Sequence, residues 1–514
     1  MFRSFRNAKR LLDIARLMAR HDALFPLEYL NVAPMIVAIA RRVSKRDVPG
    51  RPGQRLATAL NEAGPSFIKL GQILATRSDL LGEELAKDLS DLQDRLPPFP
   101  GAEARAAIET EFDETIEEMF QSFDDVAVAA ASIAQVHFAV TKDDHEVAVK
   151  VLRPDIEEAF ARDLDLLHWI ADLVERARPE FRRLKPREIV ETLSATVELE
   201  MDLRFEAAAA EELLENFEGD EDFVVPTIDW AHTGQRVLTT ERIHGISMDD
   251  RAAIEAAGHD PVEITAKAAR ATFKQIFRDG FFHADVHPGN LFVIETGQIA
   301  AVDFGIMGRV DIRTRRILGE MLLAFLTRDY RRAAEIHFEA GWVPADQSVD
   351  VFTQACRSIA EPILDKPQNE ISIARLLGQL FQITETFQME TQPQLLLLQK
   401  TMLVAEGTAR TLSPDTNMWM LAKPMIEAWM EETLGPEARI RVAVEGIADA
   451  VDKLPRMLEG IGETSAMISG GRVRLHPETI AQLRRDSAGG GGIVQSLWFF
   501  AILLLIIVVV VKFS

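Results

Sequence analysis

The sequence predicts an α+β fold of two lobes, with a helical extension before them and a transmembrane helix after them. Three observations lead to this prediction. Short strand-like segments near 126–151 interrupt long stretches of helical periodicity, polar side chains gather between 281 and 305, and the chain becomes almost wholly apolar near its end. A chain of 514 residues, 47% of them hydrophobic, is long enough to form a large core and several domains.

Composition excludes some classes of function. The chain carries 57 basic and 80 acidic side chains, a formal charge of -23, so nucleic-acid phosphates would be repelled over most of its surface and no nucleic-acid partner is expected. A single cysteine, Cys356, excludes an intramolecular disulfide and any metal site built from several thiolates. This cysteine content fits a reducing compartment.

The first segment, 1–50, is basic, with ten Lys or Arg against four acids. Leu11, Ile14, Ala15 and Met18 share one helical face, which predicts either an amphipathic helix on an anionic membrane surface or a helix docked on the body. Helical periodicity then continues through an extension at 51–122, broken by a turn at 96–101. The further divisions we predict are a small lobe at 123–242, a large helical lobe at 243–440, a helical tail with a glycine linker at 441–492 and a transmembrane helix at 493–512.

The transmembrane prediction depends on the run from Ile493 to Val511, in which Gln495 and Ser496 are the polar residues. As a helix this run would be roughly 28 Å long, enough to span a bilayer. Two arginines lie upstream and one lysine downstream, so the positive-inside rule predicts a bacterial cytoplasmic (inner) membrane protein whose catalytic body faces the cytoplasm.

The small lobe contains the strand-like segment EVAVKV, in which Val-Ala-Val precedes Lys150, the pattern of a lysine that holds nucleotide phosphates. Before it lies an alanine-rich loop where a kinase has a glycine-rich loop over the phosphates. Ala131 and Ala134 of this loop stiffen the backbone, and Ser132 and Gln135 could donate to phosphates. His137 is expected to make a polar contact within the fold.

The large lobe contains the stretch FFHADVHPGNLFV at 281–293, in which Pro288 and Gly289 predict a loop. Asp285 and Asn290 lie on this loop, and Asp303 follows as the first residue of an Asp-Phe-Gly triplet. Phosphoryl transfer from a nucleotide needs such a set, in which Asp285 acts on the acceptor while Asn290 and Asp303 hold magnesium. The spacing matches a kinase catalytic loop with Ala284 in place of its arginine. The predicted cofactors are therefore ATP and Mg²⁺.

A carboxylate is also expected beside Lys150. The segment ELEMDLRFEAAAAEEL offers Glu206 as the first candidate and Glu200 as the second, with Asp202 on the same helical face as Glu206. Further upstream, Lys69, Gly71 and Gln72 stand in a helical stretch, where glycine costs up to about 1 kcal/mol relative to alanine. Close packing against another helix would explain Gly71, but it leaves Lys69 and Gln72 unexplained.

Taken in order, these motifs resemble the UbiB family, the atypical protein-kinase-like group also called AarF/ABC1/ADCK. The motifs are Lys69-x-Gly71-Gln72, the alanine-rich AAASIAQVH, VAVK, Glu200-x-Asp202 with LRFEA, HADVHPGN and DFG, and the similarity covers roughly residues 50 to 440.

This resemblance implies a protein-kinase-like fold in which the extension covers the nucleotide site. Lys69 and Gln72 would meet Glu200 and Asp202 where a peptide substrate would otherwise bind. The resemblance also implies a magnesium-dependent ATPase or kinase-like protein that supports ubiquinone biosynthesis, with membrane lipids, polyprenylated quinone precursors and quinone-biosynthesis enzymes as partners. Two positions depart from the family pattern, Ala209 in place of an asparagine and Ala134 in place of a frequent glycine.

Two other functions use the same residues. One is a protein kinase that phosphorylates another polypeptide, which needs an open peptide groove. The other is a nucleotide-sensing scaffold that assembles quinone-biosynthesis enzymes without chemistry.

Overall fold

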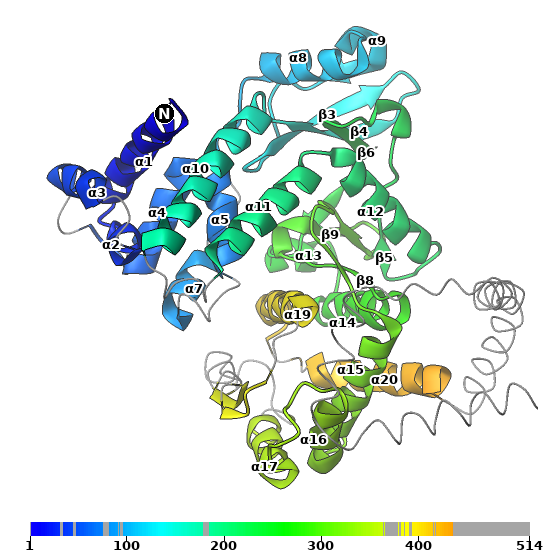
Figure 1. Ribbon diagram of the computed structural model, residues 1–514. Helices are drawn as coiled ribbons and strands as arrows, with labels where there is room; N and C mark the ends of the chain where they lie inside the picture. The colour runs from blue at the N-terminus through cyan, green and yellow to red at the C-terminus, as the bar shows by residue number, and fades with distance from the viewer. Residues whose placement is uncertain are drawn as a thin grey trace, which may run out of the picture. The chain divides into compact units, whose positions relative to one another are not determined.

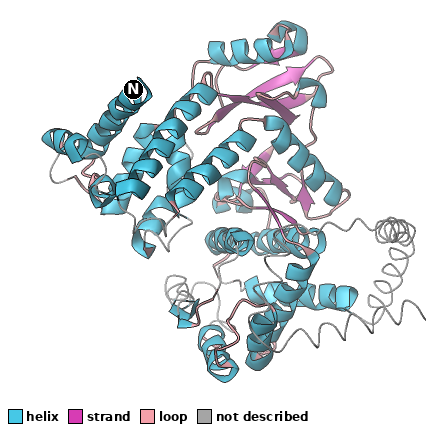
Figure 2. Ribbon diagram, viewed as in Figure 1, coloured by secondary structure: helices cyan, strands magenta, loops and turns pink. Residues whose placement is uncertain are grey.

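Two separate groups of strands, each covered by helices, organise the chain in the computed structural model (Figures 1 and 2). The structure describes residues 2–434 apart from gaps at 31–33, 45–47, 76–81, 91, 93–95 and 178–184 and several positions between 363 and 417. The N-terminal elements are α1 (Phe2–Arg20), α2 (Phe25–Leu30), α3 (Pro34–Ala40), η1 (Arg41–Val43), α4 (Pro52–Ala63), α5 (Pro65–Ala75) and α7 (Glu83–Ser90).

The first group of strands forms a five-stranded antiparallel sheet in the order β1-β3-β4-β6, with β2 paired to β3. Along the chain, this part contains α8 (Gly101–Phe112), α9 (Ile116–Met119), β1 (Phe120–Phe123), β2 (Ala129–Ala130), β3 (Ala134–Thr141), β4 (Glu146–Leu152), α10 (Ile156–Ala177), α11 (Pro186–Glu200), α12 (Leu203–Asn216), β5 (Phe223–Val224), η3 (Trp230–His232) and β6 (Val237–Glu241). Of these strands, β5 belongs to the second group.

The period of two along β4 gives this sheet two different faces. Val147, Val149 and Val151 are buried on one face, in a core cluster that also contains Ile108 of α8 and Ile116 of α9. The residues between them, among them Lys150, therefore point to the opposite face, away from α8 and α9.

The second group of strands carries the motif-rich segment. A mixed sheet has the order β5-β10-β9-β7, with β5 and β10 parallel, and a two-stranded sheet pairs β8 with β11. Its elements are β7 (Gly245–Ser247), α13 (Arg251–Ala256), α14 (Pro261–Phe273), the π-helix η4 (Lys274–Asp279), β8 (Phe281–His283), η5 (Pro288–Asn290), β9 (Leu291–Ile294), β10 (Ile299–Ala301) and β11 (Met307–Arg309). The helices α15 (Ile312–Leu326), α16 (Tyr330–Glu339), α17 (Val349–Ala360), α19 (Pro393–Leu412) and α20 (Met418–Leu434) follow.

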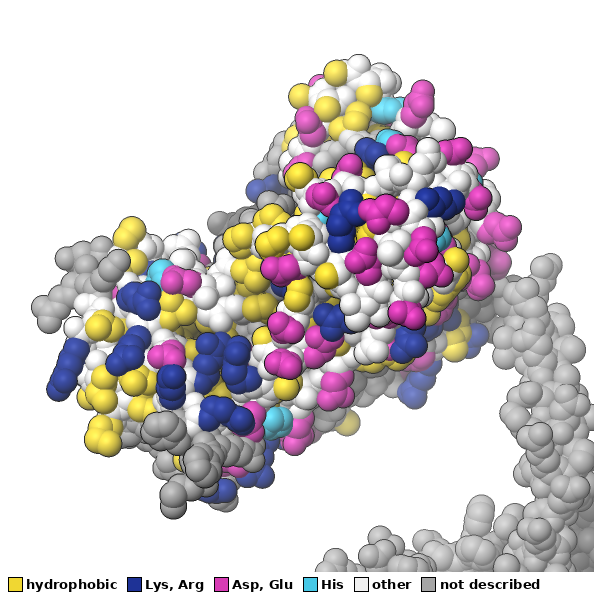
Figure 3. Space-filling view, turned by 90° about the horizontal axis from the view of Figure 1, so that it is seen from above, with side chains coloured by type: hydrophobic (Ala, Val, Ile, Leu, Met, Phe, Trp, Pro, Cys, Tyr) yellow, Lys and Arg dark blue, Asp and Glu magenta, His cyan; other side chains and the backbone are white. Residues whose placement is uncertain are grey.

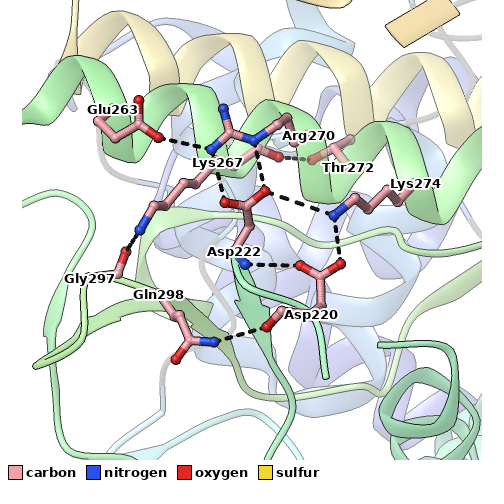
Figure 4. Close-up of polar contacts among 10 residues, drawn as sticks. Asp220, Asp222, Glu263, Lys267, Arg270, Thr272, Lys274, Gly297 and Gln298 are labelled. Atoms are coloured by element: carbon pink, nitrogen blue, oxygen red, sulfur yellow. Dashed lines mark hydrogen bonds and ion pairs between the residues drawn. The ribbon is translucent and has the colours of Figure 1, made fainter. Parts of the chain in front are cut away.

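A network of charges fixes α14 and the start of η4 to this second group of strands (Figure 4). Arg270 donates to both carboxylate oxygens of Asp222 at 2.7 and 2.9 Å, and Lys274 pairs with Asp220 at 2.6 Å. Lys267 donates to the carbonyl of Gly297 at 2.7 Å, in the turn between β9 and β10. The hydrogen bond from Arg270 holds the pKa of Asp222 below its usual value. Because η4 and β8 continue directly from α14, this network also positions the loop after β8.

The N-terminal helices and the pair α10 and α11 share one core cluster. Leu11 and Met18 of α1 are buried in this cluster with Leu60 of α4 and Leu166 of α10. Arg10 adds a two-pronged hydrogen bond to Asp163 at 2.9 and 3.0 Å. Two interpretations of the basic first segment were open, and the structure supports the helix docked on the body, because the apolar face of α1 packs against it. Figure 3 shows Lys and Arg gathered over these N-terminal helices, while Asp and Glu dominate the other part of that face.

The predicted C-terminal transmembrane helix requires correction. No helix within the described part of the chain, which ends at residue 434, is both long and apolar enough to cross a membrane. The predicted span, 493–512, and most of the predicted tail at 441–492 lie outside the described residues. Over the described residues the fold is therefore a kinase-like mixture of helices and sheets in which no helix could cross a membrane, and the predicted transmembrane helix is withdrawn together with the predicted location at a bacterial cytoplasmic membrane.

Candidate active site

Lys150 lies at the centre of a charged cluster that joins the two groups of strands. Its ammonium donates to both carboxylate oxygens of Glu206 on α12, at 2.8 and 2.9 Å, and to Asp303 Oδ1 at 2.9 Å. The Lys150 side chain is 15% exposed and that of Glu206 is 8% exposed, whereas the Asp303 side chain is 46% exposed. The cluster is thus closed on the side of α12 and open on the side of Asp303.

Burial and mutual attraction oppose each other in this cluster. Burial raises the pKa of Glu206 to about 7 despite the nearby Lys150 charge. Burial alone would lower the pKa of Lys150, but Asp303 and Glu206 outweigh it, so this pKa is raised above its usual value. Burial alone would raise the pKa of Asp303, but Lys150 outweighs it and the pKa is held well below its usual value. At neutral pH, Lys150 is therefore a cation beside an ionised Asp303.

The loop after β8 presents Asp285 and Asn290. Asn290 Nδ2 donates to the carbonyl of Asp285 at 3.2 Å, which leaves the amide oxygen of Asn290 available as an acceptor. The backbone N–H of Val302 donates to the Asn290 carbonyl at 2.9 Å, so this loop is joined to the strand that leads into Asp303. Asp303 itself has a φ of 63°, in the left-handed region that non-glycine residues rarely adopt. The two acidic segments are thus held together by main-chain contacts.

His283 makes a second connection between these segments. The backbone N–H of Asp285 donates to His283 Nδ1 at 3.1 Å, so the proton of the neutral ring is on Nε2, which donates to the carbonyl of Val302 at 3.3 Å. Burial lowers the pKa of His283, which keeps the ring neutral at physiological pH. His283 therefore holds the Asp285 loop against the residue that precedes Asp303.

Gln275 supports the same loop from the π-helix. Its side-chain oxygen accepts from the backbone N–H of His283 at 2.9 Å, and Gln275 is 3% exposed. A π-helical turn shifts the side chains that follow it relative to an α-helix, and such turns occur frequently at functional sites. Nothing in the spacing of the sequence distinguishes this turn from the α-helix before it, so sequence reasoning missed Gln275.

The side chains of Lys400 and His287 lie near the Asp285 carboxylate. Lys400 Nζ, on α19, is 3.8 Å from Asp285 Oδ1, and His287 Nε2 is 3.7 Å from Asp285 Oδ2. Thr401, the neighbour of Lys400, places its hydroxyl 3.4 Å from the carbonyl of Ala284. Lys400 was not among the predicted site residues, because α19 is distant in sequence from the Asp285 loop. Thr401 and Ala284, which are in contact, are 117 positions apart.

The site residues predicted in the alanine-rich loop lie in different surroundings. Ser132 is fully buried, and the carbonyl of Ala131 accepts two hydrogen bonds from Arg153, at 2.9 and 3.2 Å. Ala134 pairs with Leu152 in the sheet, two positions along β4 from Lys150, and thus belongs to the same face as that lysine. The structure brings Ala134 to the candidate nucleotide side.

The structure does not bring Gln135 to that side. Gln135 pairs with Val151, so its side chain points to the face opposite to Lys150. There its amide exchanges hydrogen bonds with the backbone of Phe99, at 2.9 and 3.2 Å, and contacts His137 at 2.8 Å. Gln135 therefore holds the 96–101 segment, and the phosphate contact predicted for it is corrected. His137, stacked on Phe123 at 5.0 Å, makes the expected polar contact within the fold.

The extension reaches the core of the protein through Lys69 of α5. Lys69 Nζ lies 3.0 and 2.9 Å from the two carboxylate oxygens of Glu200, at the end of α11, and the two side chains are only 8% and 10% exposed. A Cβ on Gly71 would lie 2.4 Å from Leu92 Cδ1, which agrees with close packing as the reason for this glycine. Gln72 follows in the same helix and is half-buried.

Asp202 has a different partner from the one that the resemblance implies. It begins α12 as its N-cap and accepts from the Arg204 side chain at 2.8 and 2.6 Å. Ala209, one of the two departures from the family pattern, is half-buried and packs against a core cluster that includes Phe304. Glu200 therefore belongs to the contact with the extension, while Glu206 is the carboxylate that meets Lys150.

The donor set fits magnesium bound together with phosphates. Within the described residues no group of three or more His, Cys, Asp or Glu side chains is arranged to hold a metal ion. Mg²⁺ commonly takes one or two protein oxygens and completes its octahedron with substrate phosphates and water. The exposed carboxylate of Asp303 and the amide oxygen of Asn290 are ligands of this kind.

This arrangement of a strand lysine, a helix glutamate, an Asp-Asn loop and an Asp-Phe-Gly triplet defines the class of atypical kinase-like proteins. Comparison with known proteins agrees with this class, because the model of the "ABC1 atypical kinase-like domain" matches residues 91–337 and that of the "UbiB helical domain" matches 356–417. A solved structure described as the complex of Rv3197 with erythromycin, from Mycobacterium tuberculosis, has a similar fold, with a TM-score of 0.51 and 24% identity over 75% of this chain and 96% of that chain.

Curated relatives identify the family. "Probable protein kinase UbiB" of Marinobacter nauticus is 43% identical over 79% of this chain and 75% of its own length. The protein of the same name from Aeromonas hydrophila is 43% identical over 89% of this chain and 85% of its own length. The chain belongs to the UbiB family.

Proposed function

We propose that this protein is a magnesium-dependent, kinase-like ATPase that supports ubiquinone biosynthesis. The observation that carries the proposal is the contact of Lys150 with both Glu206 and Asp303, beside a loop that presents Asp285 and Asn290. The names of the relatives and the matching family models support a kinase-like protein, and the UbiB name supports the link to ubiquinone. Polyprenylated quinone precursors and the enzymes that modify them are the proposed partners.

The proposed reaction assigns a role to each group. Lys150, held by Glu206, would neutralise the nucleotide phosphates, while Asn290 and Asp303 would hold magnesium. Bound magnesium would offset negative charge on the phosphate oxygens. Asp285 would orient a water molecule and accept its proton as the water oxygen bonds to the γ-phosphorus. The bond from that phosphorus to the bridging oxygen breaks, and ADP leaves with the electron pair.

The proposal is tested through Asp303. Replacing Asp303 with Asn removes the carboxylate that would hold magnesium while the side chain keeps its shape. We expect magnesium-dependent ATP binding, measured by calorimetry, to be lost. Asp143→Asn, in the exposed turn between β3 and β4, is the control and should bind like the parent chain. Unchanged magnesium-dependent binding by the Asp303 variant would reject the site.

The acceptor is tested with labelled ATP. Purified protein with magnesium, a phenol that mimics a quinone precursor and cell extract should release labelled phosphate more than it labels polypeptides. Strong labelling of another polypeptide, absent from a Lys150→Ala control, would instead show a kinase that acts in trans. Tight binding without turnover would favour the scaffold, and an Asp285→Asn variant that still restores quinone production in cells would then support it.

A further inference from the structure

Helix α19 brings a lysine to the proposed catalytic carboxylate. Lys400 Nζ lies 3.8 Å from Asp285 Oδ1, and its side chain is 43% exposed. This distance exceeds that of a hydrogen bond, so the ammonium is near the carboxylate without being bound to it in a fixed geometry. Lys150, in contrast, makes three contacts between 2.8 and 2.9 Å and is only 15% exposed.

Packing determines where Lys400 lies. Leu398 of α19 is buried in the same core cluster as Phe282 and Ala284. One turn later, Val404 packs against the cluster that contains Val286. The buried hydroxyl of Thr401 lies 3.4 Å from the Ala284 carbonyl. The helix therefore contacts the loop on both sides of Asp285, and the Lys400 backbone has little freedom to move away.

The charge of Lys400 has a chemical use at this position. Kinase catalytic loops carry an arginine before the aspartate, but this chain has Ala284 there. The loop thus lacks that cation, and α19 places another beside the same aspartate. Negative charge is spread over the oxygens of the transferred phosphoryl group, and a nearby cation stabilises it most where water is partly excluded.

We propose that Lys400 is a further catalytic residue, whose ammonium contacts the transferred phosphoryl group beside Asp285. This inference rests on the proposed function, because it assumes that Asp285 faces the γ-phosphate of a bound nucleotide. The four-carbon stem of a half-exposed lysine can move its charge by a few ångströms, from the carboxylate to a phosphoryl oxygen. Lys400 then acts on the transferred group, while Lys150 acts on the phosphates that remain with the nucleotide.

The test compares three variants of the full chain. Lys400→Met removes the charge and keeps most of the length, Lys400→Arg keeps the charge, and Arg410→Gln removes an exposed cation further along the same helix. With Lys400→Met we expect kcat for ATP hydrolysis to fall by about 100-fold, as when one transition-state donor is removed, with KM for MgATP changed less than about threefold. Lys400→Arg should recover most of kcat, and Arg410→Gln should match the parent chain.

A binding measurement keeps the test independent of turnover. Mg-ADP with aluminium fluoride imitates the transferred phosphoryl group, so Lys400→Met should bind this mixture about 100-fold more weakly while its affinity for Mg-ADP alone is unchanged. Parent-like affinity for the mixture, or an equal loss in Arg410→Gln, would overturn the role of Lys400. If the parent chain binds no magnesium nucleotide, both this inference and the proposed function are overturned. If the parent chain hydrolyses ATP and Lys400→Met hydrolyses it at the same rate, this inference alone is overturned.

Discussion

Glu206 is the residue whose protonation decides the charge of the candidate site. Its carboxylate is buried and accepts two hydrogen bonds from Lys150, at 2.8 and 2.9 Å. Burial raises its pKa from the ordinary 4.5 to about 7, so Glu206 titrates close to physiological pH. When Glu206 takes up a proton, Lys150 loses one of the two carboxylates that hold it in place.

This pKa predicts a pH dependence of nucleotide turnover. The folded chain binds the Glu206 proton more tightly than the unfolded chain, so the stability from this group is full below about pH 4.5 and is lost as pH rises through about 7. Activity should follow the opposite trend and decline as pH falls through about 7. In Glu206→Gln, kcat/KM should be lower at every pH and should lack this step between pH 6 and 8. A step of the same size in the variant would show that another group titrates.

At the residue scale, sequence spacing identified side chains that come from one local segment. Asp285 and Asn290 share a loop, and their spacing together with the Asp303 triplet was sufficient to place them near each other. Lys400 could not be found in this way, because only the packing of α19 brings it to the loop. Gln135, which the sequence suggested as a phosphate donor, points away from Lys150, because the register between β3 and β4 decides its direction and the sequence does not state that register.

Elements with strong local patterns were predictable, and those that depend on tertiary contacts were less so. The strands β3 and β4, both rich in valine, coincide with the predicted region at 126–151 except for the last residue of β4. The periodicity of α1 indicated its apolar face but not what covers it, because a membrane and a protein core bury the same residues. The strand β8, with three residues, and the π-helix before it are too short for any periodicity to appear.

The network on α14 predicts how this element contributes to stability (Figure 4). Asp222→Asn keeps the shape of the side chain but removes the charge that faces Arg270. We expect the free energy of unfolding at pH 7 to fall by about 1 to 2 kcal/mol, the range for hydrogen bonds to charged groups that are partly exposed. Since the folded-state pKa of Asp222 is depressed, its contribution is present above about pH 4 and is lost as pH falls through the folded value.

Urea unfolding of the full chain across this pH range tests the prediction for Asp222. The difference between variant and parent should shrink as the medium becomes acidic. Asp350→Asn is the control, because Asp350 also pairs with an arginine but its side chain is 82% exposed. This control should change the unfolding free energy by less than about 0.5 kcal/mol. A difference for Asp222→Asn that is independent of pH would mean that the charge of Asp222 is not responsible for its contribution.

At the scale of the whole molecule, the extension is part of the protein's core. Its helices bury residues such as Phe67 and Leu60 in one cluster with Leu193 of α11. The contact between Lys69 and Glu200 joins the extension to the helix that leads, after Asp202, into α12 and Glu206. A rearrangement of the extension would therefore reach Lys150 through two consecutive helices.

This connection predicts that the contact between Lys69 and Glu200 stabilises the site as well as the extension. Lys69→Met or Glu200→Gln removes one charge of a buried ion pair, which should cost about 3 kcal/mol of unfolding free energy. The double variant should cost less than the sum of the two, because the two single variants disrupt the same contact. Hydrogen exchange should become faster in α5, α11 and the first turn of α12, while α17 keeps the parent rate. The prediction is contradicted if the unfolding free-energy changes of the two single variants add in the double variant and hydrogen exchange becomes faster in α5 alone. The extension would then be independent of α12, and its motion would not reach Glu206.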